Sequence, residues 1–161
     1  MSQRTDAIRN HLETRHAETW PVLEGLDESD MSAEVYSSEE GSWTVKDLVG
    51  HLADGERGNL GLAKRLVAGE QTVPPDFDLD RWNRGAVRRA SETSPAELMG
   101  VIFESYTRAL EFLDGLEDNE LDLVGLHSSG EMLTTEGFLR RMVDHRFEHV
   151  TDMQAALSKQ S

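Results

Sequence analysis

Three histidines are the residues of this sequence best suited to chemistry. His145 and His149 stand four positions apart near the end of the sequence, and His51 comes much earlier. Side chains four apart on a helix have Cβ atoms about 5 to 6 Å apart, so both rings can reach one ion at metal–nitrogen distances of about 2.0 to 2.1 Å. A third imidazole from a neighbouring helix would complete a metal site. Histidines that only pack or contact solvent fit the same spacing, and that interpretation stays open.

Two predicted helices position these histidines. Apolar residues recur at helical spacing from about Thr135 to Leu157, and His145 and His149 border the stripe that they form. Its members are Phe138, Leu139, Met142, Val143, Val150, Met153 and Leu157. A second helix is predicted after a turn at residues 41–43, with Thr44 as N-cap, and runs toward Gly69. There His51 borders a stripe of Leu48, Val49, Leu52, Ala63, Leu66 and Val67.

The rest of the chain also has mainly helical periodicity. A first helix is expected over about residues 3–26, with Pro21 kinking or splitting it, and Ile8, Leu12, Trp20 and Leu23 face inward. Pro74 and Pro75 mark residues 70–77 as a connection before a short polar helix at 78–90. The next long helix begins at Ser94-Pro95-Ala96-Glu97, a capping-box sequence, and ends at Gly115. Residues 117–134 are expected to form a long loop with a turn at 128–130.

These elements predict an all-α protein of one domain spanning residues 1–161. Strand-like alternation is nearly absent, and neither an internal repeat nor a second-domain boundary is visible. Four long helices with unequal connections favour a four-helix bundle, in which side chains projecting inward from facing helices commonly form metal sites.

Composition excludes several classes of function. The formal charge of −15, from 31 acidic and 16 basic residues, would repel a nucleic-acid backbone. No cysteine is present, so any metal must be held by nitrogen and oxygen, and any thiol nucleophile must come from a cosubstrate. We expect no membrane span and no signal peptide, and hence a cytoplasmic protein.

Two charged residues interrupt the apolar stripes. Glu56 falls within the stripe of the second helix, and Arg146 lies near the centre of the stripe of the last one. An unpaired buried charge costs several kcal/mol, so we predict that the two face each other or a polar ligand. Alternatively, one of them reaches solvent or a dimer interface along its flexible stem. Among the other histidines, His11 and His16 are interpreted as structural or solvated, and His127 as a loop residue able to close over a site.

Two segments resemble a known family. The sequence from Trp43 to Glu56, WTVKDLVGHLADGE, together with Asp144 to His149, DHRFEH, is similar to the DinB-like superfamily of four-helix bundle proteins. That superfamily includes bacterial metalloenzymes and the metal-binding domain of mycothiol-dependent maleylpyruvate isomerase. The resemblance covers nearly the whole chain and implies an up-down-down-up bundle with a long connection between the second and third long helices.

The resemblance also implies a function. The three-histidine site of the family maps onto His51, His145 and His149 and would hold divalent zinc, nickel or iron. The expected protein is a homodimeric enzyme acting on a small electrophile, either a transferase or isomerase with a low-molecular-weight thiol cosubstrate, or a hydrolase. Glu56 and Arg146 are the candidate catalytic residues, with Asp54 a weaker candidate. The alternative is a non-catalytic helical stress protein that binds a metal or small ligand.

Overall fold

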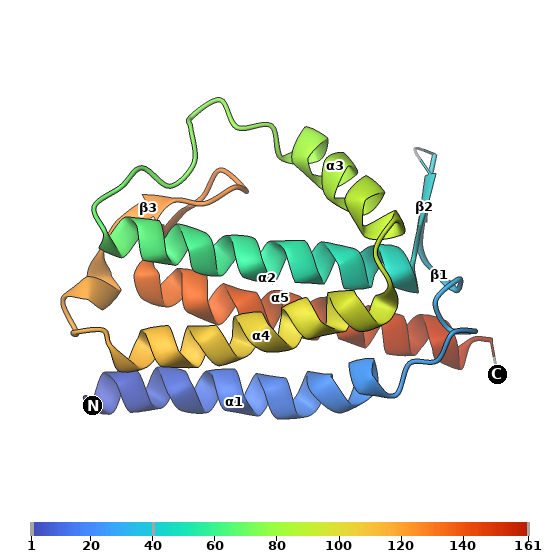
Figure 1. Cartoon of the computed structure of the whole chain (residues 1–161), viewed down its shortest axis with the longest axis horizontal. Helices are drawn as coiled ribbons and strands as arrows, with labels where there is room; N and C mark the ends of the chain where they lie inside the picture. Colours follow the sequence, from blue (N-terminus) through green and yellow to red (C-terminus); the bar gives the residue numbers. More distant parts are fainter. Residues whose placement is uncertain (1, 40, 161) are drawn as a thin grey trace.

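The computed structural model describes residues 2–39 and 41–160, and most of them are helical. The four long helices are α1 (Gln3–Glu24), α2 (Val45–Val67), α4 (Pro95–Asp114) and α5 (Thr135–Ser158). In Figure 1, α1 and α5 run in one direction and α2 and α4 in the other, which is the expected up-down-down-up order. The long connection between α2 and α4 contains the shorter helix α3 (Leu79–Ser91). The predicted four-helix bundle is confirmed.

Local capping groups fix the starts of two helices where the sequence predicts them. Thr44 Oγ1 accepts the backbone N–H of Asp47, and the Asp47 carboxylate accepts the backbone N–H of Thr44. Ser94 and Glu97 form the same capping box at the start of α4. These reciprocal bonds satisfy N–H groups that a helix start leaves without partners.

Pro21 does not split α1. The helix continues through it to Glu24, and the N–H of Gly25 bonds to the Pro21 carbonyl at 3.1 Å. A proline removes one helical hydrogen bond, and Pro21 does so within the final turn, where the helix is about to end in any case.

Two short β-hairpins are present that the sequence does not predict. β1 (Glu34–Ser38) pairs with β2 (Gly41–Thr44), and β3 (Val124–Leu126) pairs with β4 (Met132–Thr134), both antiparallel. The expected turn at 41–43 is therefore a strand, and the expected loop at 117–134 contains a 3-10 turn, η1 (Glu120–Asp122), and a hairpin closed at residues 128–130. Strands of three to five residues are too short to display a clear alternating pattern.

The hairpins reveal a repeated arrangement that is not visible as a sequence repeat. Each hairpin follows a long helix and ends at the threonine that caps the next one, Thr44 for α2 and Thr134 for α5. The same backbone bond closes both, from Val45 N–H to the Ala33 carbonyl and from Thr135 N–H to the Leu123 carbonyl, each 2.9 Å long. The two helices that carry the three histidines thus begin in the same way.

The bundle core is divided by a buried polar layer. One apolar cluster contains Leu23, Leu52, Ile102 and Val150, and the other contains Leu12, Leu60, Ala109 and Val143. Between these positions, each long helix contributes at least one buried polar residue, and these are Thr19, Glu56, Asn59, Ser105 and Arg146. The predicted inward residues of α1, α2 and α5 are buried or half-buried, as expected.

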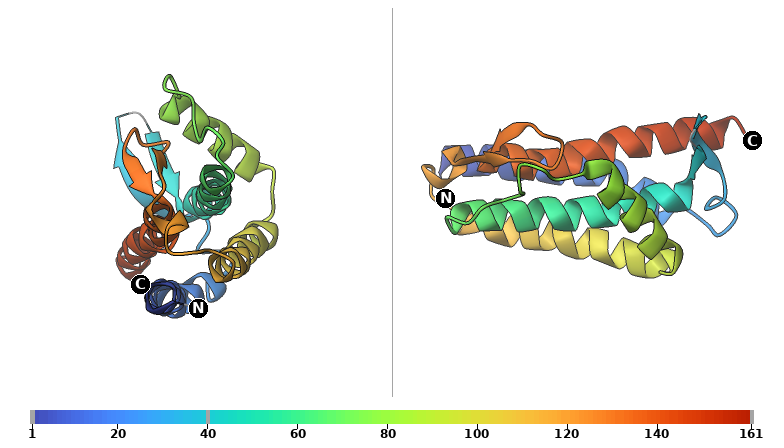
Figure 2. Two further views of the ribbon diagram at one scale, coloured as in Figure 1. Left: turned by 90° about the vertical axis from the view of Figure 1, so that its left-hand side faces the viewer. Right: turned by 90° about the horizontal axis from the view of Figure 1, so that it is seen from above.

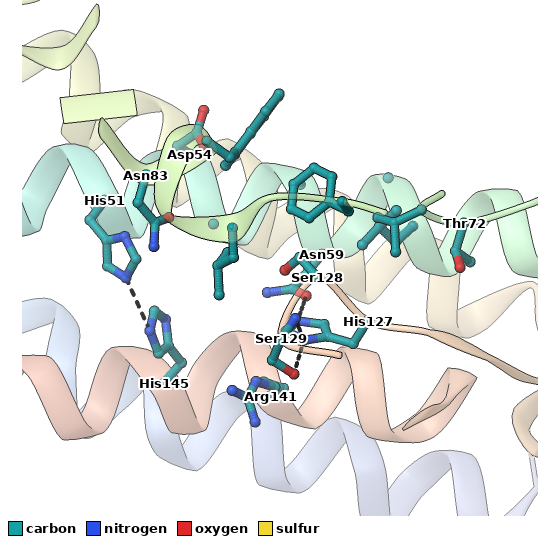
Figure 3. A pocket seen from close by; sticks show the side chains of 18 of the residues that line it. His51, Asp54, Asn59, Thr72, Asn83, His127, Ser128, Ser129, Arg141 and His145 are labelled. Atoms are coloured by element: carbon teal, nitrogen blue, oxygen red, sulfur yellow. Dashed lines mark hydrogen bonds between the residues drawn. The ribbon is translucent and has the colours of Figure 1, made fainter. Parts of the chain in front are cut away.

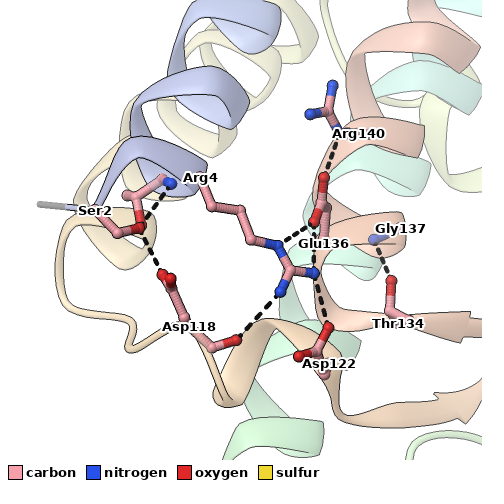
Figure 4. Close-up of polar contacts among 9 residues, drawn as sticks. Ser2, Arg4, Asp118, Asp122, Thr134, Glu136, Gly137 and Arg140 are labelled. Atoms are coloured by element: carbon pink, nitrogen blue, oxygen red, sulfur yellow. Dashed lines mark hydrogen bonds and ion pairs between the residues drawn. The ribbon is translucent and has the colours of Figure 1, made fainter.

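Polar contacts also tie the start of α1 to the start of α5. Arg4 donates from Nε to Glu136 and from Nη2 to Asp122, both at 2.8 Å, while Ser2 donates to Asp118 (Figure 4). Ion pairs this exposed contribute little individually, and the cluster serves mainly to fix how these segments meet.

Helix α3 lies outside the bundle against α2 (Figure 2). The contact is close at Gly50, because a Cβ there would lie 2.2 Å from the Ala90 Cβ. Within the described residues, no helix has both the length and the apolar character needed to cross a membrane.

Candidate metal centre

The three histidines meet as the sequence predicts. The Nε2 atom of His145 lies 3.2 Å from that of His51 and 2.9 Å from that of His149. His51 comes from α2 and the other two come from adjacent turns of α5, and Figure 3 shows His51 and His145 facing each other across the two helices. Their potential ligand atoms all lie within 4.8 Å of one another.

This arrangement fits a divalent ion. Three imidazole nitrogens bound tetrahedrally at about 2.0 to 2.1 Å would lie about 3.3 Å apart, close to the separations in this site. Without an ion, each of these two contacts needs a proton on one of its Nε2 atoms, which then donates an N–H···N hydrogen bond to the other. The donor set is uncharged, so it suits zinc, nickel and iron alike and leaves positions for further ligands.

Tyr36 fixes the tautomer of His149. The Tyr36 hydroxyl donates its single hydrogen to Asp152, so it can only accept from His149 Nδ1, which lies 2.9 Å away. The proton of His149 therefore sits on Nδ1, and Nε2 is free to face the other two histidines. A hydrogen bond of this kind orients a metal-binding imidazole and raises its basicity. Sequence reasoning missed Tyr36, because the strand that carries it was not predicted.

The partner strand of the same hairpin supports His51. Trp43 of β2 packs edge-on against the His51 ring, with centroids 5.4 Å apart and planes at 82°. Tyr36 and Trp43 are cross-strand partners. The β1–β2 hairpin therefore contacts two of the three candidate ligands.

All three rings are poor bases in this environment. Burial lowers the pKa of His51 to about 4 and that of His145 to about 3, and the neighbouring histidines reinforce both shifts. Burial also lowers the pKa of His149, although Asp152 and Glu148 oppose it. Neutral imidazoles at pH 7 offer lone pairs to a metal without first losing a proton.

A cavity of about 570 Å³ opens beside the site (Figure 3). His51 and His145 line one part of it, and α2, α3, α5, the 68–78 connection and the β3–β4 turn supply its walls. Gly55, Gly58 and Gly61 of α2 line the cavity, and a Cβ at any of them would touch no neighbouring element. These three positions of the helix therefore face open space. Gly55, one helical turn after His51 on α2, is among the residues that line this cavity. Its volume suits a small organic molecule.

Glu56 and Arg146 form a buried ion pair. Arg146 Nε lies 3.1 Å from both Glu56 carboxylate oxygens, its Nη2 also donates to Glu56, and the side chains are 1% and 0% exposed. Burial raises the pKa of the Glu56 carboxyl, and the guanidinium opposes that shift. The predicted contact exists, and neither residue reaches solvent. Neither lines the cavity either, so the structure gives them no direct route to a substrate there.

The remaining histidines have protein partners. His16 accepts a hydrogen bond from Arg146 at 2.8 Å and stacks on Tyr106 with ring centroids 3.7 Å apart, while His11 pairs with Asp144 on α5. Both are structural, which is one of the two expected outcomes. His127 is buried in the β3–β4 turn, lines the cavity and bonds to Asn59 at 2.8 Å.

Asp54 lines the cavity but is engaged by other groups. It accepts from Trp82 Nε1 at 2.8 Å, with Arg57 and Arg89 at 3.6 and 3.5 Å. These contacts tie α3 to α2 beside His51.

The sequence is similar to that of known proteins. Residues 11–153 match the sequence profile of the DinB superfamily. The chain is 25% identical over 123 residues to the Oceanobacillus iheyensis protein named "Putative metal-dependent hydrolase OB0413". The aligned region covers 76% of this chain and 69% of that protein.

Solved structures of other proteins have a similar fold. YfiT from Bacillus subtilis, described as a probable metal-dependent hydrolase with an unusual four-helix bundle topology, has a TM-score of 0.77 and 21% identity over 99% of this chain and 90% of its own. The mycothiol-dependent maleylpyruvate isomerase has a TM-score of 0.75 and 16% identity over 92% of this chain. The match spans only 60% of the isomerase chain. With the profile covering most of its length and the fold in agreement, this chain belongs to the DinB superfamily.

Proposed function

We propose that this protein is a divalent-metal-dependent enzyme in which His51, His145 and His149 hold the ion. The main support is the position of the three Nε2 atoms at the edge of a cavity of small-molecule size. The Nε2 atom of His145 lies 3.2 Å from that of His51 and 2.9 Å from that of His149. Structural metal sites normally use four protein ligands, whereas three leave positions open for reactants.

The reaction class we propose is nucleophilic attack on a small electrophile. A bound divalent ion would supply Lewis acidity, activating a water or thiol nucleophile and polarising an electrophilic carbonyl. A relative named as a metal-dependent hydrolase supports the water route. The mycothiol dependence of a structural neighbour supports the thiol route, in which a low-molecular-weight thiol is the cosubstrate because this chain has no cysteine.

The surrounding residues have positioning roles. Tyr36 and Asp152 hold the proton of His149 on Nδ1, and Trp43 packs the ring of His51. We assign Glu56 and Arg146 a positioning role in place of the catalytic role expected from the sequence, because their pair joins α2 to α5 inside the bundle and away from the cavity. The homodimer and the cytoplasmic location stay predictions.

Elemental analysis of tag-free protein, purified without chelator, tests the metal site. The parent should hold about one equivalent of a transition metal, and a His145→Ala/His149→Ala variant should hold none. His11→Ala is the matched control, because His11 pairs with Asp144 outside the site. A parent that stays metal-free after incubation with zinc, nickel and iron would exclude the proposed site.

Activity assays then separate the two routes. Metal-loaded protein would be assayed against activated esters and amides, and separately against electrophiles with a panel of thiols. Hydrolysis without thiol identifies a hydrolase, and turnover that requires a thiol identifies a transferase or isomerase. A loaded protein inert in both assays would favour the non-catalytic binding protein.

A further inference from the structure

The cavity contains a cation close to the candidate metal centre. Arg141 lines the cavity one helical turn before His145 on α5, and Figure 3 places it between His145 and Ser129. Arg65 also lines the cavity, but it follows His51 by 14 residues on α2. At 1.5 Å per residue that is about 21 Å along the helix axis, against about 6 Å for Arg141 and His145. Arg141 is therefore the cavity cation placed to meet a small molecule bound at the histidines.

The Arg141 guanidinium has donors to spare. Within the described residues it donates one hydrogen bond, from Nη1 to Glu131 at 3.3 Å. The two side chains are 39% and 61% exposed, so water weakens the pair. A guanidinium carries five N–H donors in a planar fork that matches a carboxylate. An anion entering the cavity can bind to this fork without breaking a buried contact.

A chain of hydrogen bonds orients a second donor that lines the same cavity. The Ser129 backbone N–H donates to His127 Nδ1 at 3.0 Å, so the proton of the neutral ring is on Nε2. That proton is donated to Asn59 Oδ1 at 2.8 Å, which fixes the amide orientation. Asn59 lines the cavity, and among the described residues its amide nitrogen has no protein acceptor. Its N–H groups are left for a cavity ligand.

The rest of the lining is suited to a hydrocarbon chain or ring. Leu62, Val73, Phe77 and Trp82 line the cavity together with the open glycine face of α2. A ligand that fits would join an apolar body to an acceptor group near Arg141 and Asn59.

We propose that Arg141 and Asn59 bind a carboxylate of the substrate, about one helical turn from the reacting end, and that His127 positions Asn59. The substrate class is then a small carboxylic acid with an apolar body. This inference rests on the proposed function, because the reacting end is assigned to the metal site.

Cobalt(II)-loaded protein provides the test, because visible absorption reports the metal and a sulfur-to-cobalt band reports a bound thiol. The probes are 3-mercaptopropionate and its uncharged analogue 3-mercapto-1-propanol. The parent should bind the acid at least about tenfold more tightly than the alcohol, as expected for a hydrogen bond to a charged group.

Three variants assign that preference to residues. Arg141→Gln should abolish it while cobalt binding stays unchanged. Asn59→Asp keeps the acceptor for His127 but replaces the N–H donors by an anionic oxygen, so it should abolish the preference too. Arg140→Gln is the control, because Arg140 pairs with Glu136 at 2.9 Å and does not line the cavity, and it should keep the preference.

The outcomes separate this inference from the proposed function. Equal affinities for the two thiols in cobalt-loaded parent, or a preference that survives Arg141→Gln, would overturn the carboxylate site and leave the metal site standing. Parent protein that takes up no cobalt would overturn both.

Discussion

Tyr36 and Trp43 are cross-strand partners in the β1–β2 hairpin, and each contacts a different histidine of the candidate metal centre. Tyr36 holds His149 through its hydroxyl, and Trp43 packs the edge of His51. The histidines lie on two helices, and the hairpin bridges them. The hairpin therefore holds both histidines in position, and Tyr36 and Trp43 should influence metal affinity without being ligands.

Tyr36→Phe should weaken metal binding about 10- to 100-fold, the usual cost of losing a hydrogen-bond partner of a metal-bound histidine. The substitution removes only the hydroxyl and keeps the aromatic ring at position 36. His149 is then free to change its tautomer and its orientation. Competition against a chelator of known affinity would measure the effect. Tyr106→Phe is the control, since Tyr106 stacks on His16 away from the site. Equal affinities of parent and Tyr36→Phe would show that the bond to Tyr36 does not tune the site.

Glu56→Gln should destabilise the fold by about 3 to 5 kcal/mol, because it leaves the Arg146 charge buried without its counter-ion. A double Glu56→Leu/Arg146→Met variant should recover much of the loss, since it buries no charge. Urea unfolding of Glu56→Leu, Arg146→Met and the double variant would give the coupling energy. The exposed pair of Glu104 and Arg108 provides the comparison, and Arg108→Met should cost less than about 1 kcal/mol. Additive effects at positions 56 and 146 would contradict the pairing.

Two glycines of α2 should respond to alanine in opposite directions. Gly50→Ala places a methyl group 2.2 Å from the Ala90 Cβ and should cost about 1 to 3 kcal/mol as α3 is displaced. Gly58→Ala meets no neighbouring element and should stabilise the helix by about 0.5 to 1 kcal/mol. Thermal unfolding of the two variants would measure both changes. A Gly50→Ala protein as stable as the parent would mean that α3 does not pack closely against α2.

Acidification should destabilise the metal-free protein between pH 6.5 and pH 4. Burial lowers the pKa of His16, His51 and His127 to about 4, whereas histidine in an unfolded chain titrates near pH 6.5. Between these values the unfolded chain binds more protons than the folded protein, so the free energy of unfolding decreases as the pH falls. Above pH 6.5 both states are neutral at these positions, and their contribution is constant.

Thermal unfolding at half-unit steps from pH 7.5 to pH 5 would measure this dependence above the range where most carboxylates titrate. A His51→Gln/His127→Gln variant should show a shallower decrease than the parent. A parent midpoint that stays constant down to pH 5 would be incompatible with buried neutral histidines.

The sequence by itself determined the helices and the metal-ligand candidates. Thr44, Ser94 and Pro95 set helix starts through bonds or backbone angles within one turn, so their effect can be seen in a short window. The spacing of His145 and His149 likewise follows from one helical turn. His51 was paired with them through its apolar stripe and the family resemblance, and the structure places its Nε2 atom 3.2 Å from that of His145.

The tertiary structure alone decided what surrounds those residues. Tyr36 reaches His149 across 113 positions, and His127 reaches Asn59 across 68, through hairpins too short to show a periodic pattern. Glu56 and Arg146 were predicted to meet, yet only the packing of all four helices put their pair in the buried layer and not in the cavity. Contacts so distant in sequence depend on how helices and hairpins pack together, and that information is not contained in any one segment of the chain.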